Sequence, residues 1–77
     1  MATFTSLIGK RVEVNYRAGD IRMTATGTLA IDSGEFIRIE DRFSHSGREK
    51  TVRLEIPYPS LVRVRRIFLD TEHSSPL

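Results

Sequence analysis

The sequence predicts an all-β domain, a strongly bent five-stranded antiparallel small barrel preceded by a short helical turn. Apolar or small residues occupy alternate positions from Ile21 to Ile31, which is typical of a strand with one buried face. Other alternating segments flank this strand and are separated by turns that contain glycine or proline. Because the chain has only 77 residues, so long a strand implies a small and strongly curved sheet.

Each expected element is justified by its own residues. Thr5 and Ser6 are candidate caps for the helical turn, which Gly9 ends. Gly27 is the expected bend of the long strand, because glycine within a strand marks a bulge, a corner or a close backbone approach. Pro57 and Pro59 end the fourth strand, and only a tight turn fits before the fifth. The expected elements are, in chain order, a helical turn at 5–8 and strands at 11–17, 21–31, 36–40, 51–56 and 61–67.

The segments between the strands are polar. We expect turns at 18–20 and 32–34 and a polar loop at 42–50. A chain of this length forms one core, so a single domain is expected over 1–69. Residues 70–77 show no periodicity and are expected to form an unstructured tail.

Several functional classes are disfavoured by composition. The chain has no cysteine, which excludes disulfides, thiolate catalysis and thiolate metal sites. It has no basic N-terminal region followed by a long apolar stretch, and no segment of the about 20 apolar residues that a membrane span needs. We therefore expect a soluble cytoplasmic protein.

Catalytic chemistry has little support in the residues. His45 lies in the expected loop and His73 in the tail, and neither has a neighbouring nucleophile or carboxylate on a rigid element. The adjacent Glu40 and Asp41 would lie on opposite faces of a strand. Phosphate-binding loops and metalloprotease motifs are absent. The sequence predicts no enzyme, no cofactor and no metal, and an enzyme would need a site assembled between subunits.

Basic residues gather in the second half of the chain. From Asp41 to Leu69 there are seven basic and three acidic residues, a net charge of +4. Only Lys10 and Lys50 are lysines, and arginine is the cation best suited to phosphate recognition and base stacking. These arginines are either solvated strand faces or contacts to a polyanion.

The first part of the chain resembles the first motif of Sm-like (LSm and Hfq) proteins. The similarity lies in LIGKRVEV at 7–14, Gly19, GTL at 27–29, Asp32 and IRI at 37–39, and it extends from Leu7 to about Ile67. It implies a homo-oligomeric ring of five to seven subunits, with single-stranded RNA bound by loops that line the pore.

A second family is also similar. The segment LEIPYPSL at 54–61 resembles the strand–turn–strand unit of the C-terminal barrel in RimP-type ribosome-maturation factors, which share the Sm-like fold. This resemblance implies an alternative function, a structural or protein-interaction barrel of the ribosome-assembly type without an RNA pocket.

The Sm-like resemblance implies which strands join subunits. In such rings the fourth strand of one subunit pairs with the fifth strand of the next, which here are 51–56 and 61–67. The alternative is a monomer whose edges are protected by Arg53, Arg63 and Arg65, since charged residues commonly block edge strands. The candidate interface residues are Val52, Leu54, Ile56, Val62 and Val64.

The RNA-binding residues implied by the resemblance depart in part from the family pattern. Asp32 matches the family's Asp, whereas Phe36 stands where Asn is expected and Pro57-Tyr58 replaces an Arg-Gly pair. Aromatic rings accept stacked bases at about 1–3 kcal/mol per base. Alternatively, Phe36 is a hydrophobic subunit contact and Tyr58 a packed turn residue. The candidate RNA-binding residues are Asp32, Phe36, Arg38, Tyr58 and Arg63.

Overall fold

The computed structural model describes residues 2–68 of the chain. The expected tail at 70–77, with His73, lies outside the described residues. The elements are the 3-10 helix η1 (Thr5–Leu7), the strands β1 (Arg11–Ala18), β2 (Ile21–Asp32), β3 (Phe36–His45) and β4 (Arg48–Pro57), the 3-10 helix η2 (Tyr58–Ser60) and the strand β5 (Leu61–Arg66).

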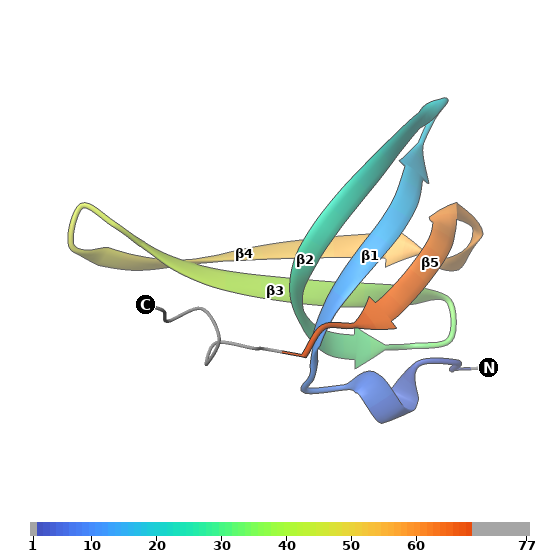
Figure 1. Ribbon diagram of the computed structural model, residues 1–77, viewed down its shortest axis with the longest axis horizontal. Helices are drawn as coiled ribbons and strands as arrows, with labels where there is room; N and C mark the ends of the chain where they lie inside the picture. The colour runs from blue at the N-terminus through green and yellow to red at the C-terminus, as the bar shows by residue number, and fades with distance from the viewer. Residues whose placement is uncertain (1, 69–77) are drawn as a thin grey trace, which may run out of the picture.

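All five strands belong to one antiparallel sheet with the order β4-β3-β2-β1-β5. The prediction of an all-β fold with five antiparallel strands is therefore confirmed. Tight turns connect β1 to β2, β2 to β3 and β3 to β4. The short helix η2 then leads to β5, which lies on the side of β1 opposite to β2 (Figure 1). Because β4 and β5 pair with β3 and β1 alone, the sheet is open within one chain, and closure into a barrel is not confirmed.

The long strand β2 bends at Gly27. Its first part pairs with β1, up to Thr28 opposite Arg11, and its last part pairs with β3 from Thr28 to Asp32. A Cβ atom at Gly27 would lie 2.7 Å from the backbone oxygen of Glu40. The predicted close backbone approach is thus confirmed. It lets the β1–β2 and β3–β4 hairpins diverge from a shared base (Figure 1).

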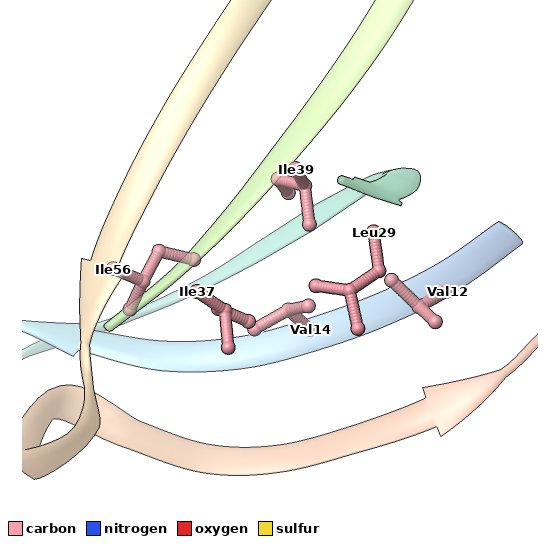
Figure 2. Packing of buried hydrophobic residues seen from close by; sticks show 6 residues of the cluster. All are labelled: Val12, Val14, Leu29, Ile37, Ile39 and Ile56. Carbon is pink, nitrogen blue, oxygen red and sulfur yellow. The ribbon is translucent and has the colours of Figure 1, made fainter. Parts of the chain in front are cut away.

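The core lies at that shared base. Six aliphatic side chains from β1, β2, β3 and β4 point toward one another there (Figure 2) and are at most 3% exposed. Their positions follow the predicted alternation, because side chains two residues apart share one face of a strand. The buried residues are Val12, Val14, Leu29, Ile37, Ile39 and Ile56.

The alternation does not lead to burial beyond the bend. Ile21 and Met23 lie on the same face of β2 as Leu29, yet they are 63% and 41% exposed. Between Gly27 and the β1–β2 turn, the β1–β2 hairpin diverges from the β3–β4 hairpin, so no opposing layer covers these side chains. A pattern of alternating residues identifies a face, whereas the distance to the next hairpin decides whether that face is buried.

The predicted polar loop at 42–50 is wrong. β3 extends to His45 and β4 begins at Arg48, so only Ser46 and Gly47 connect the two strands. Both residues have positive φ, 54° and 75°, as a two-residue type I′ hairpin turn requires. Cross-strand pairing therefore continues through a polar segment that has no hydrophobic period.

The predicted caps of the N-terminal turn are also wrong. Phe4 is the N-cap residue of η1, and no side chain caps this turn. The backbone N–H of Phe4 instead donates a hydrogen bond to the Asp32 carboxylate at 2.7 Å. A long-range contact replaces the local one, because a three-residue helix has little stability of its own.

Candidate RNA-binding and assembly surfaces

Asp32, the last residue of β2, is the centre of a hydrogen-bonded corner. Its Oδ1 accepts hydrogen bonds from the Gly34 N–H at 3.0 Å and the Tyr58 hydroxyl at 2.6 Å, and its Oδ2 accepts the bond from Phe4 N–H. The Asp-Ser-Gly sequence favours this local bond, since aspartate at a turn commonly binds a backbone N–H two residues on. One carboxylate thus joins the N-terminal segment, the β2–β3 turn and η2.

The corner also determines the protonation of Asp32. Burial removes water from the carboxylate and would by itself raise its pKa, but the hydrogen bonds from Tyr58, Phe4 and Gly34 outweigh this effect. The pKa of Asp32 therefore lies below its ordinary value of 3.8. The carboxylate is charged at neutral pH and serves as an acceptor within the fold.

Tyr58 is held on several sides. Its hydroxyl accepts a hydrogen bond from Thr3 N–H at 2.9 Å and its own N–H donates to the Glu35 carbonyl at 2.8 Å. Its ring lies 5.9 Å from the Phe4 ring, at an interplanar angle of 55°. The ring is therefore part of the packing beneath the N-terminal segment.

The other three candidate RNA-binding residues lie on strands, Phe36 and Arg38 on β3 and Arg63 on β5. Phe36 is half-buried and opposite Pro57, at the start of β3. Arg38 forms an ion pair across the sheet with Glu55, with Nε 2.9 Å from the carboxylate. Arg63 is exposed on β5, opposite Asn15. The structure brings Asp32 and Tyr58 into direct contact. Arg63 is not part of this corner, because it lies on β5 opposite Asn15.

The five candidate interface residues have different surroundings. Ile56 is 1% exposed and belongs to the core, and Leu54 and Val64 pack against it. Val52 on β4 is 52% exposed and Val62 on β5 is 44% exposed. These two residues are therefore the members of the set most available to a second molecule.

A bulge explains the exposure of Val62. Asn15 is opposite Arg63, and the next residue, Tyr16, is opposite Leu61, so Val62 has no partner on β1. An unpaired bulge residue breaks the alternation of side chains. Simple alternation along 61–67 would place Val62 and Val64 on one face, but only Val64 packs against the core.

An apolar groove lies between the two diverging hairpins, beside the β4 edge. It has a volume of about 290 Å³, and the polar residues that line it are Thr26, Glu40 and Asp41. Its apolar lining is formed by Ala25, Ile39, Phe43, Val52 and Leu54. Sequence reasoning missed it because it treated 42–50 as a loop, although alternation from Val52 to Ile56 marks one of its walls.

Two further properties concern the described part of the chain. Residues 2–68 contain no group of three or more His, Cys, Asp or Glu side chains arranged to hold a metal ion. No helix in this range is long and apolar enough to cross a membrane.

No family model matches the chain, and searches of curated proteins and of solved structures found no match.

Proposed function

We propose that this protein is a non-enzymatic Sm-like barrel that assembles into a homo-oligomeric ring and binds single-stranded RNA. The observation that carries the proposal is the strand order, with β4 and β5 at the two edges of one open sheet. Pairing β4 of one copy with β5 of the next would satisfy both edges. Such a head-to-tail contact generates a ring when its rotation closes.

The side chains near the edges support self-association. Val52 on β4 and Val62 on β5 are exposed on the two edge strands, and the apolar groove adjoins the β4 edge. Contiguous apolar surface of this kind is typical of interaction sites.

Two of the three arginines expected to protect the edges of a monomer are engaged within the sheet. Arg53 pairs with Glu40 at 3.3 Å and Arg65 pairs with Glu13 at 3.0 Å. Each contact is across to a neighbouring strand of the same sheet. The monomer with arginine-protected edges is therefore less favoured, although ion pairs as exposed as these contribute little stability.

The alternative function also has an observation in its favour. Asp32, Tyr58 and Arg38 already have partners within the chain, so the corner where the family resemblance implies an RNA pocket is occupied by the fold's own contacts. A structural or protein-interaction barrel of the ribosome-assembly type would have this property. The proposed RNA contact must then use other residues.

The proposal is tested by the molar mass of the pure protein, measured by light scattering after size exclusion, with and without short uridine-rich and adenine-rich RNA. We expect a mass of several subunits that increases with RNA. A ring that ignores both RNAs would support the alternative function, and a monomer would refute the ring.

Substitution of the edge residues gives a second prediction. Val52→Lys is expected to convert the ring to smaller species, because it places a charge in the middle of the β4–β5 contact. Light scattering measures the change. Ile8→Lys is the matched control, since Ile8 is also exposed, at 42%, but lies outside both edge strands. An unchanged mass for Val52→Lys would contradict the proposed pairing.

A further inference from the structure

Three arginines form a cluster on the outer, solvent-facing side of β5, β1 and β2, near the β1–β2 turn. Arg17 on β1 is directly opposite Arg22 on β2. Arg63 on β5 is directly opposite Asn15, which lies two residues before Arg17 on the same face of β1. Adjacent strands are about 4.8 Å apart. We call Arg17, Arg22 and Arg63 the arginine cluster.

The cluster has no carboxylate partner within residues 2–68. The ion pairs of this part of the chain involve Arg11, Arg38, Arg53 and Arg65. Glu13, the carboxylate two residues before Asn15 on the same face, is held by Arg65. All three arginines of the cluster are exposed, so their guanidinium groups are available to a ligand.

The pairing of Arg17 with Arg22 is unfavourable for the isolated chain. Like charges directly opposite each other on neighbouring strands destabilise a sheet. A polyanion bound across the two strands would remove this repulsion, and it would gain charge-assisted hydrogen bonds from guanidinium forks that match phosphate geometry.

Asn15 adds neutral donors to the same surface. Its side-chain Oδ1 accepts a hydrogen bond from the Thr24 hydroxyl at 2.9 Å, and its two amide N–H donors remain for an oxygen ligand. The face thus offers donors from three strands and is lined by arginine, asparagine and threonine.

We propose that the arginine cluster binds the phosphate backbone of single-stranded RNA. This inference rests on the RNA binding proposed above, but it does not require the ring. RNA fits better than an acidic protein surface, because protein interfaces depend on buried aromatic or apolar anchors, whereas the residues directly opposite Asn15 on its two neighbouring strands are Thr24 and Arg63. Phosphate contacts need only positive charge and donors.

The test is the affinity of labelled oligouridine and oligoadenine for the full chain, measured by fluorescence anisotropy between 50 and 300 mM salt. Arg17→Gln/Arg22→Gln is compared with Arg42→Gln/Arg48→Gln, which removes the same charge from exposed arginines of the other hairpin. We expect the cluster variant to bind at least about 10-fold more weakly at 0.1 M salt and to lower the salt-dependence slope by about 1.4, which corresponds to two lost phosphate contacts.

Three further measurements complete the test. Adding Arg63→Gln to the cluster variant is expected to weaken binding again, and the thermal midpoint should not fall, because the repulsion between Arg17 and Arg22 is removed. Equal losses in the cluster and control variants would overturn the cluster while RNA binding itself stands. Polyglutamate that competes as well as RNA of equal charge would overturn it in favour of an acidic protein. No binding by the unaltered chain at 50 mM salt would refute both the cluster and the RNA half of the proposed function.

Discussion

Gly27→Ala is expected to destabilise the protein by about 3 kcal/mol, as severe overpacking does. The added Cβ would lie 2.7 Å from the carbonyl oxygen of Glu40 and 3.2 Å from its carbonyl carbon. Both are backbone atoms of the paired strand β3, so neither can move aside without breaking the β2–β3 ladder. A domain of this size has a total stability of roughly 4–12 kcal/mol, and the loss would remove a large part of it.

Urea unfolding monitored by circular dichroism measures this effect. Gly19→Ala is the matched control, because Gly19 has a φ of 67° but nothing within 4 Å of its added Cβ. The control should lose only about 1 kcal/mol, the cost of the left-handed conformation for a residue with a side chain. Equal losses at the two positions would mean that backbone conformation, and not the contact with Glu40, explains the glycine.

Asp32→Ala is expected to cost about 2 kcal/mol of stability, because Tyr58, Phe4 and Gly34 each lose an acceptor in a partly buried corner. Release of the N-terminal segment would accompany the loss, since Thr3 and Phe4 are attached to this corner. Hydrogen exchange of residues 3–8 would report the release. Asp20→Ala, in the exposed β1–β2 turn, is the control and should change little.

The same carboxylate makes stability depend on pH. Its pKa is lowered in the folded state, so the unfolded chain binds more protons in the window between the folded and unfolded pKa values. The stabilisation is therefore complete above the ordinary pKa of 3.8 and is lost as the pH falls through the lower folded value. Unfolding curves from pH 2 to 7 should show a steeper acid loss for the unaltered chain than for Asp32→Asn.

Measuring both the stability and the RNA affinity of Asp32→Ala decides between interpretations of Asp32. If Asp32→Ala left stability unchanged but abolished RNA binding, Asp32 would be an RNA contact, as the family resemblance implies. Loss of stability with retained RNA affinity would assign Asp32 to the fold alone.

The predicted strands were most accurate where polar and apolar residues alternate. Val12, Val14, Leu29, Ile37 and Ile39 are all buried in the structure, as alternation within each strand predicted, and Ile56, a candidate interface residue, is buried in the core with them. The prediction failed at 42–50, where strand pairing depends on the positive φ of Ser46 and Gly47 and no hydrophobic period marks the strands. It also failed at Val62, because a bulge arises from the register between β1 and β5.

The candidate site was less predictable than the fold. Asp32, Phe36, Arg38, Tyr58 and Arg63 were selected by residue type and by resemblance, both of which are properties of single positions. Whether Arg38 is free depends on Glu55, 17 residues later in the chain. The arginine cluster depends on the register that brings Arg17 beside Arg22 and Arg63 beside Asn15.

The sequence by itself determined the all-β class and which side chains share a strand face, because both depend on neighbours one or two residues away, and its glycine marked the position at which β2 bends. Only the tertiary structure decided which alternating rows become covered, since Ile21 and Met23 stay exposed where the hairpins diverge. It also decided which charged groups already have partners, as for Asp32 with Tyr58. The physical reason is that burial and ion pairing are contacts between residues distant in the chain, and strand register rather than residue type determines those contacts.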